Sequence, residues 1–311
     1  MNVSTWTIMI TSPAASLIII NYNGADLLPD CIESVLPTLR AQDELLVVDN
    51  ASADTSLAVL ARFADVIKIV PLPRNIGFGR ACNLGSAAAR GDLLVFLNPD
   101  VTFPHNWRAP LVHAAWSDPR IALLCPQTLL PGSPDPCTSG SEVEEHATVP
   151  GCCLAVRRDA WLALGGFDEA FFLYWEDIEL CWRAWLLGWR VVTARRSWVY
   201  HQKSAITARR GGWDAERMRN SMYTYLKLMR WPVVLQYMMR LLVITAIKSL
   251  RDPSLAPHLA LAWWWNIAHL KRTLLLRHAI AARRIGSYSR LEHMIRTQND
   301  EIRQQRRSHH T

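Results

Sequence analysis

The sequence predicts an α/β protein in which a mostly parallel central sheet is covered by helices on both faces. Two observations support this fold class. Short apolar segments alternate with segments of helical spacing along the first third of the chain. In addition, half of the 311 residues are hydrophobic, which is enough for a sizeable core. Strands that are apolar along most of their length are typical of a sheet buried on both faces.

The elements of the first third follow this alternation in order. Each expected strand is a short run rich in Leu, Ile and Val that ends in polar residues, and these runs lie at 16–24, 44–52, 66–72 and 91–101. Helices are expected between them, at 25–39, 52–64 and 74–90. The first has apolar residues at helical spacing, the second begins with Ser and Asp, and the third follows a glycine-rich start.

Further along the chain the pattern is less regular. Residues 131–145 are rich in proline and glycine, which predicts a loop, and its three glutamates, at 142, 144 and 145, are expected to face solvent. Residues 149–166 predict a strand, a basic turn and a short helix. Residues 190–202 predict a further strand.

Polar side chains collect where the predicted strands end. They are Asn21, Asn23, Asp49, Asn50, Asn98 and Asp100. Because ligands of open α/β sheets bind at the carboxyl ends of the strands, this edge is the predicted nucleotide site. Asp100 is the best candidate for a ligand of Mg²⁺ or Mn²⁺, although an Asn-Pro-Asp sequence by itself more often forms only a turn. The glycines at 77 and 79 do not make a dinucleotide fingerprint, because Cys82 occupies the third glycine position.

The segment 165–189 carries the strongest candidate for catalysis. An aromatic run is followed by Glu176 and Asp177, and apolar residues then recur at helical spacing. Acidic residues in the first turn of a helix are favoured by the helix dipole, which is an ordinary structural explanation for the pair. A carboxylate beside aromatic residues also suits a general base that deprotonates a sugar hydroxyl, and we therefore predict that this segment supplies the base.

The charge is divided unevenly along the chain. Residues 1–200 carry 14 Lys and Arg against 21 Asp and Glu, whereas residues 201–311 carry 20 against 6. A basic C-terminal part predicts contact with an anionic surface. We favour a membrane over nucleic acid, because the tryptophans cluster in apolar helices rather than alternating with basic residues.

Residues 222–250 predict a strongly apolar helix with a narrow polar stripe. The part from 231 to 250 is long enough to span a bilayer, but Arg240 near its centre opposes insertion by about 2.5–3.5 kcal/mol. We therefore expect an interfacial helix, with Trp263, Trp264 and Trp265 at the level of the lipid headgroups. The alternative is a helical appendage that packs on the domain or forms a homodimer. The seven cysteines lack metal-type spacing, and with no evident signal sequence we expect a cytosolic protein.

Six segments, in this order, resemble an inverting family-2 glycosyltransferase of the GT-A fold, on the branch that includes bacterial rhamnosyltransferases. They are IIINYNG (18–24), LLVVDNASADTS (45–56), RNIGFGRACNLG (74–85), LLVFLNPDV (93–101), GCCLAVRRDAW (151–161) and GGFDEAFFLYWEDIELCWRAWLLGWRV (165–191). The resemblance covers about residues 16–201.

The resemblance implies a role for each matching residue. The nucleotide-sugar site would comprise Tyr22, Asn23, Asp49, Asn75, Gly77, Asn83 and Asn98. Asp100 corresponds to the last acid of the metal motif and His201 to a C-terminal histidine that contacts metal or diphosphate. Asp177 corresponds to the catalytic base, with Glu176 beside it. Asn98 stands where many relatives have aspartate.

We accordingly predict a GT-A catalytic domain at 1–212, with a nucleotide-sugar half at about 16–101 and an acceptor half at about 102–212. A basic helical tail follows at 213–311. The predicted activity is transfer of a sugar, L-rhamnose from dTDP-rhamnose, to a saccharide or polyprenyl-linked acceptor on the inner face of the cell membrane. The alternatives are a sugar nucleotidyltransferase and a non-catalytic membrane-binding relative.

Overall fold

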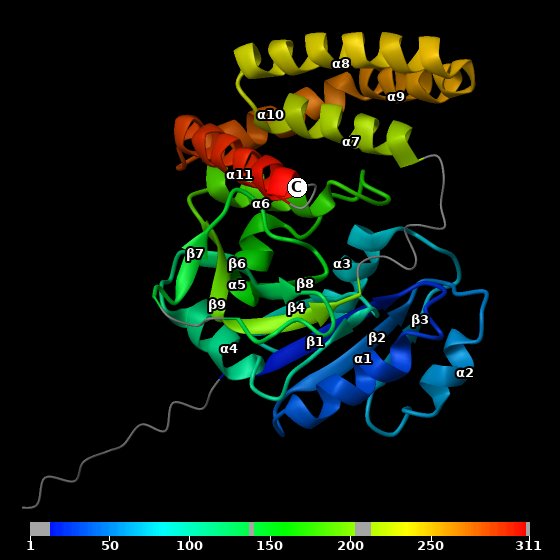
Figure 1. Ribbon diagram of the computed structural model, residues 1–311, viewed down its shortest axis with the longest axis vertical. Coiled ribbons are helices and arrows are strands. Elements are labelled where there is room, and N and C mark those ends of the chain that lie inside the picture. The colour runs from blue at the N-terminus through cyan, green and yellow to red at the C-terminus, as the bar shows by residue number, and fades with distance from the viewer. Residues whose placement is uncertain (1–12, 137–139, 203–212, 309–311) are drawn as a thin grey trace, which may run out of the picture.

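The computed structural model describes residues 13–136, 140–202 and 213–308 (Figure 1). The strands are β1 (Ala15–Asn21), β2 (Glu44–Asp49), β3 (Lys68–Pro71), β4 (Leu93–Leu97), β5 (Val101–Thr102), β6 (Ile121–Leu129), β7 (Val143–Glu145), β8 (Cys153–Arg157) and β9 (Arg190–His201). The helices of the sheet-containing part are α1 (Leu28–Val35), α2 (Ser56–Ala61), α3 (Phe78–Ala88), α4 (Arg108–Trp116), α5 (Arg158–Leu164) and α6 (Glu176–Leu186). The C-terminal helices are α7 (Trp213–Leu228), α8 (Trp231–Arg251), α9 (Ala256–Ala268), α10 (Leu270–Arg283) and α11 (Tyr288–Ser308).

The described strands form one sheet in the order β3-β2-β1-β4-β8-β6-β9-β5, with β7 paired to β9. The pairs among β1 to β4 are parallel, and the pairing becomes antiparallel on both sides of β8. The predicted α/β fold is therefore confirmed, with a mixed sheet whose first four strands are parallel. Because parallel neighbours end at the same edge, the polar ends of β1, β2 and β4 are brought together.

Both faces of the sheet are covered, as predicted. Side chains that alternate along β1, β2 and β4 enter two separate hydrophobic clusters. One cluster lies under α1, α2 and α4, and the other lies under α3, α5 and α6. Alternation of side chains across the strand is what allows one strand to supply both clusters. Six cysteines in the described residues are free and buried.

Two sequence-based expectations need correction. The predicted loop at 131–145 contains the short strand β7, and Glu145 on it pairs with Arg190 and Arg290 instead of facing solvent alone. The apolar segment 222–250 forms two helices rather than one, because α7 ends at Leu228 and α8 begins at Trp231, with Pro232 as its second residue. Proline lacks an N–H and fits the first turn of a new helix.

The C-terminal helices share a core with the sheet-containing part. Leu228, Val234, Ile280 and Leu291 belong to the same hydrophobic cluster as α3, α5 and α6. Figure 1 shows α11 lying over α6, with α7 and α10 above and α8 and α9 outermost. The predicted boundary near residue 212 lies outside the described residues.

Candidate active site

The carboxyl ends of β1 and β2 meet at Asn21 and Asp49, which are partners in the parallel register. Asp49 is 1% exposed, and its Oδ1 accepts hydrogen bonds from Asn21 Nδ2 at 2.8 Å and Ser52 Oγ at 2.6 Å. Its Oδ2 accepts a third from the Ser52 main-chain N–H at 3.0 Å. These bonds hold the Asp49 carboxylate in one orientation at the ligand-binding edge of the sheet.

Asn23 joins this group through the turn that follows β1. It adopts a φ of 54°, in the left-handed region that asparagine tolerates better than most residues. Its main-chain N–H donates to Ser52 Oγ at 2.9 Å, and its Oδ1 accepts from the Ala53 N–H at 2.8 Å. Tyr22, which precedes it, is half-buried. The residues predicted to bind the base and ribose are therefore neighbours, and their role remains a prediction.

The glycine-rich segment before α3 is bound to the same edge by Asn50. The Asn50 Oδ1 accepts from the Ile76 N–H at 2.9 Å, and its Nδ2 donates to the Gly77 carbonyl at 3.2 Å. Asn75 Oδ1 accepts from the Gly77 N–H at 2.9 Å. Gly77 has a φ of 88°, and a Cβ at this position would lie 2.8 Å from the Phe172 Cα, so the site requires glycine.

Asn83 has a different setting from the other predicted nucleotide ligands. Its Nδ2 donates to the Phe167 carbonyl at 3.0 Å, and its Oδ1 accepts from the Phe167 N–H at 2.9 Å. These two bonds join α3 to the segment before α6. The structure thus gives Asn83 a structural role, and its contact with the nucleotide remains a prediction.

A cavity of about 510 Å³ lies beside this edge and brings together four of the predicted site residues, Asn98, Glu176, Asp177 and His201. We call it the reaction pocket. Its other lining residues are Phe78, Thr128, Pro150, Gly151, Cys152, Leu173 and Tyr174. Phe78 directly follows the Gly77 turn, which places the reaction pocket next to the predicted nucleotide site.

The acidic pair begins α6. Asp177 Oδ2 accepts from the Gly151 N–H at 3.1 Å, and its Oδ1 accepts from the Ile178 N–H at 2.8 Å. The pKa of Asp177 is raised, because burial outweighs the opposing effect of these two N–H groups. Burial, followed by the charge of Asp177, raises the pKa of Glu176 to about 8. Glu176 is 6% exposed, and its Oε2 has no hydrogen-bond partner among the described residues. Burial thus favours a proton on Glu176, while the Gly151 and Ile178 N–H groups favour the negative charge on Asp177.

Asp100 and His201 form the predicted metal site. The His201 Nε2 lies 3.1 Å from Asp100 Oδ1, across the pairing of β5 and β9. Burial lowers the pKa of His201, but the hydrogen bonds to Asp100 and Cys152 and their charges outweigh it and raise the pKa to about 10. The 3.1 Å separation is that of an ion pair, so Mg²⁺ or Mn²⁺ would bind to both side chains only by displacing the His201 proton, whereas the Asp100 carboxylate suits either ion directly. The described residues contain no group of three or more His, Cys, Asp and Glu that could hold a metal. Diphosphate oxygens and water would supply the other ligands.

The backbone before the acidic pair is strained, and α7 supports it. Tyr174 and Trp175 both have positive φ, 67° and 75°, which is uncommon for large side chains. Asn220 on α7 is 2% exposed and donates from Nδ2 to the carbonyls of Leu173 and Tyr174 at 2.9 and 2.8 Å. The Arg217 guanidinium lies 4.1 Å from the centre of the Tyr174 ring. Sequence analysis missed these supporting residues, because nothing local to α7 signals them.

A buried ion-pair network joins α6 to α7. Glu179 pairs with Arg183 at 2.8 Å and with Lys227 at 2.7 Å, and Lys227 also pairs with Asp168 at 2.5 Å. The Tyr223 hydroxyl donates to Asp168 at 2.7 Å. Glu179 therefore has a structural role, although it lies two residues after Asp177.

Residues 16–160 match the sequence profile of Glycosyl transferase family 2. This part of the chain, from β1 into α5, therefore has the sequence of a family 2 glycosyltransferase, and the match ends before α6 and its acidic pair. The glycosyltransferase is 29% identical over 227 residues to the N-acetylglucosaminyl-diphospho-decaprenol L-rhamnosyltransferase of Mycobacterium tuberculosis. That similarity covers 58% of this chain and 74% of the mycobacterial protein.

Solved structures share the fold of the glycosyltransferase. Residues 1–349 of TarS from S. aureus, in complex with UDP-GlcNAc, have a TM-score of 0.59 at 19% identity, covering 91% of this chain and 92% of that one. The mannosyltransferase PcManGT from Pyrobaculum calidifontis, in complex with GDP-Man and Mn²⁺, has a TM-score of 0.55 at 19% identity, covering 88% and 81%. At these identities the likeness concerns the fold alone. The predicted GT-A fold and the assignment to family 2 are confirmed.

Proposed function

We propose that this glycosyltransferase moves L-rhamnose from dTDP-rhamnose to a saccharide carried on a polyprenyl diphosphate, with inversion, in cell-surface polysaccharide synthesis. The observation that carries the proposal is the presence of Asp177 in the same cavity as Asn98 and His201. A candidate base and the strand ends that would hold the sugar diphosphate are thus within one cavity. The mycobacterial relative supports the choice of rhamnose and of a diphospho-polyprenol acceptor.

In this reaction Asp177 would accept the proton of the acceptor hydroxyl. The acceptor oxygen forms a bond to C1 of the sugar as the bond from C1 to the diphosphate breaks, and the electron pair leaves with the diphosphate. The N–H groups of Gly151 and Ile178 orient the carboxylate, and its raised pKa makes it a stronger base. Protonated Glu176 keeps a second negative charge away from the pair.

Asp100 and His201 are the residues that would hold a divalent cation. When bound, Mg²⁺ or Mn²⁺ offsets the negative charge of the leaving diphosphate. We expect EDTA to abolish transfer and Mg²⁺ or Mn²⁺ to restore it. Full activity in EDTA would remove these two residues as metal ligands.

A donor panel tests the sugar and the base. The chain is incubated with an acceptor and either dTDP-rhamnose or a UDP- or GDP-sugar, and the product mass is read by mass spectrometry. We expect dTDP-rhamnose to add one deoxyhexose. Transfer from another donor and none from dTDP-rhamnose would contradict the proposed donor. Formation of a nucleotide sugar and diphosphate from a nucleoside triphosphate and a sugar 1-phosphate would instead favour the nucleotidyltransferase alternative.

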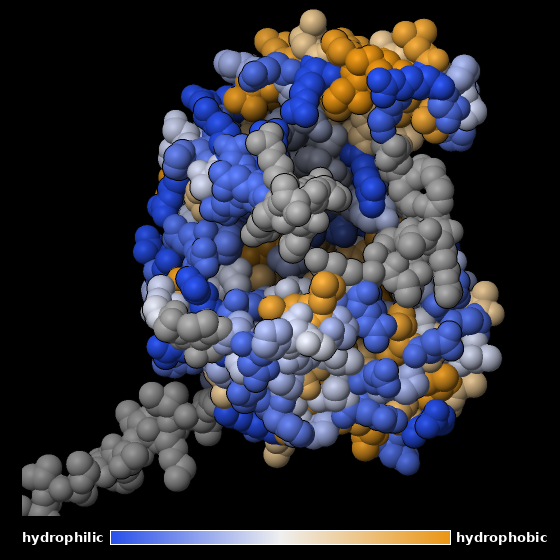
Figure 2. Space-filling view, viewed as in Figure 1, coloured by the Kyte–Doolittle hydropathy of each residue, from blue (hydrophilic) through white to orange (hydrophobic). Residues whose placement is uncertain are grey.

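We also propose that the protein lies on the cytoplasmic face of the cell membrane through α8 and α9. Figure 2 shows apolar side chains gathered over these outermost helices. Large apolar side chains exposed on them include Leu235, Met239, Leu242, Val243, Ile247, Leu250, Leu261 and Trp264. Among the described residues, the helix Trp231–Arg251 is long and apolar enough to cross a membrane by length and composition, and 11% of its apolar 18-residue stretch is buried. Its packing on α7 and α9 favours an interfacial position over a span.

Flotation with phosphatidylglycerol vesicles tests this surface. Replacing Met239 and Leu242 together by Glu should lower the partition coefficient at least tenfold, because burial of each side chain contributes about 1.5–3 kcal/mol. Leu162→Glu is the matched control, since Leu162 is 70% exposed but lies on α5. Equal flotation of the wild type and the double variant would contradict the membrane proposal.

A further inference from the structure

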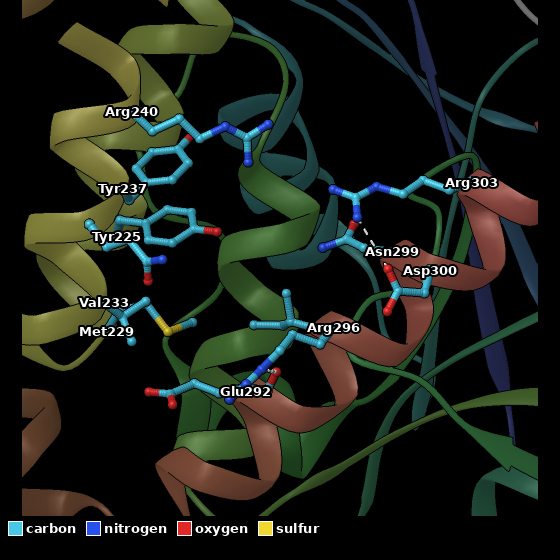
Figure 3. Close-up of a pocket in the computed structure, with 12 residues that line it drawn as sticks. Tyr225, Met229, Val233, Tyr237, Arg240, Glu292, Arg296, Asn299, Asp300 and Arg303 are labelled. Atoms are coloured by element: carbon cyan, nitrogen blue, oxygen red, sulfur yellow. Dashed lines mark hydrogen bonds and ion pairs between the residues drawn. The ribbon is translucent and has the colours of Figure 1, made fainter. Parts of the chain in front are cut away.

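A second cavity, of about 390 Å³, lies between α7, α8 and α11 (Figure 3). We call it the tail cavity. One wall is aromatic and apolar. The rings of Tyr225 on α7 and Tyr237 on α8 are stacked in parallel, with centroids 3.7 Å apart. The remaining apolar lining is Met229, Val233 and Ile295.

The other side of the tail cavity is basic. Arg240 on α8 and Arg296 and Arg303 on α11 line it, and Figure 3 shows the Arg240 and Arg303 side chains extending into the space between these helices. Arg240 makes no hydrogen bond or ion pair with any described residue. Arg296 makes one long hydrogen bond, at 3.4 Å, to the Glu292 carbonyl oxygen and pairs with no described carboxylate.

The two acids that line the tail cavity do not neutralise this charge. Glu292 accepts from Arg230 Nε at 2.9 Å, so its charge is already matched. Asp300 pairs with Arg303 at 3.2 Å. Arg240 and Arg296 are left as two positive charges beside stacked aromatic rings. Such a lining suits a ligand with a strongly anionic group, and guanidinium groups bind phosphate through several N–H groups at once.

Position on the helix strengthens this assignment. Arg240 lines the tail cavity from α8, a helix that is long and apolar enough to cross a membrane. Arg240 is exposed, and its exposed neighbours Met239, Leu242 and Val243 on the same helix are apolar. If these neighbours contact a membrane, Arg240 lies at the depth of lipid phosphates. The tail cavity would then receive a phosphate group attached to a hydrocarbon chain.

One residue connects the tail cavity to the reaction pocket. The Trp175 ring lies 6.3 Å from the Tyr225 ring that forms the aromatic wall. Its sequence neighbours, Tyr174 and Glu176, both line the reaction pocket. The aromatic wall of the tail cavity therefore packs against the segment that carries the catalytic pair.

We propose that the tail cavity binds the phosphate-bearing end of a lipid-linked acceptor, with Arg240 and Arg296 contacting a diphosphate. The stacked tyrosines and Val233 contact the first part of the lipid chain. This inference rests on the proposed transfer to a polyprenyl-linked acceptor. The same chemistry is present in free diphosphate and in bulk anionic phospholipid, and the test separates these sources.

The test uses the full chain with the nucleotide site saturated by a nucleoside diphosphate. Binding is measured by co-sedimentation with neutral phosphatidylcholine vesicles that contain polyprenyl diphosphate. A second set contains phosphatidylglycerol at the same total charge, and inorganic diphosphate is added as a competitor. Arg240→Gln is compared with Arg251→Gln, which removes the same charge from an exposed position on the same helix outside the cavity.

Arg240→Gln should weaken binding to the polyprenyl diphosphate vesicles about tenfold or more, or about 1.4 kcal/mol. Arg251→Gln should change it less than about twofold, and inorganic diphosphate should displace the wild type. If the two variants lost the same amount of binding, the attraction would be a general one to anionic lipid and the proposal would be overturned. The same conclusion would follow if Arg240→Gln weakened binding to the phosphatidylglycerol vesicles as much as to the polyprenyl diphosphate vesicles. Because no sugar donor is present, the result is independent of transfer. A chain that shows the expected binding but transfers no sugar would overturn the proposed function and leave this site standing.

Discussion

Replacement of Asp177 by asparagine tests the centre of the mechanism. Asparagine keeps the shape of the side chain and an oxygen that accepts the Gly151 N–H, so the start of α6 is preserved. What is lost is the carboxylate that would take the acceptor proton. General-base catalysis contributes about 10²–10⁴ in rate, so kcat should fall by this factor, which corresponds to about 2.7–5.5 kcal/mol in the barrier.

The assay follows release of the nucleoside diphosphate at saturating donor and acceptor, and calorimetry measures donor affinity separately. Donor affinity should change less than about threefold, because Asp177 acts on the acceptor. A turnover within about fivefold of wild type, with donor affinity unchanged, would refute Asp177 as the base.

Glu176→Gln is the matched control. At neutral pH Glu176 is protonated, and a neutral amide reproduces the neutral carboxyl group. Turnover at pH 7 should therefore stay within about fivefold of wild type. A fall of 10² or more in Glu176→Gln, together with little change in Asp177→Asn, would exchange the roles of the two residues.

Three further predictions concern stability. The pKa of Glu176 rises from 4.5 to about 8 on folding, so the free energy of unfolding should fall between about pH 4.5 and 8, by at most about 1.4 kcal/mol per pH unit. In urea denaturation Glu176→Gln should remove this part of the slope, and an identical pH dependence in both proteins would contradict the assignment. Lys227→Met leaves the buried Glu179 carboxylate with one cationic partner fewer and should lower the free energy of unfolding by about 3–5 kcal/mol. Lys271→Met, at an exposed site, should lower it by less than about 0.5 kcal/mol. Similar decreases in the two variants would disprove the role of the network. Gly77→Ala places a side chain at a positive φ and against the Phe172 backbone, so it should lower the melting temperature by several degrees and weaken donor binding. An unchanged melting temperature and donor affinity would show that the turn relaxes freely.

The sequence by itself determined the fold class and most of the polar residues at the carboxyl ends of the strands. Strands and helices of the first third follow from local periodicity, and Asn21 and Asp49 end strands that turned out to be register partners. A parallel sheet brings such strand ends together whatever the details of packing. The acidic pair could be predicted for a similar reason, because its position at a helix start is a local property.

Only the tertiary structure decided what depends on distant parts of the chain. The unequal settings of Glu176 and Asp177 arise from burial and from the Gly151 N–H, and neither is visible in the sequence around the pair. The antiparallel insertion of β8 depends on which strands become neighbours, and sequence order does not specify this. Lys227 and Asn220 support the catalytic segment from α7, because packing of a helix that follows the sheet brings them there. Local patterns specify elements, whereas the charge state and orientation of the catalytic side chains come from contacts that form only when those elements pack.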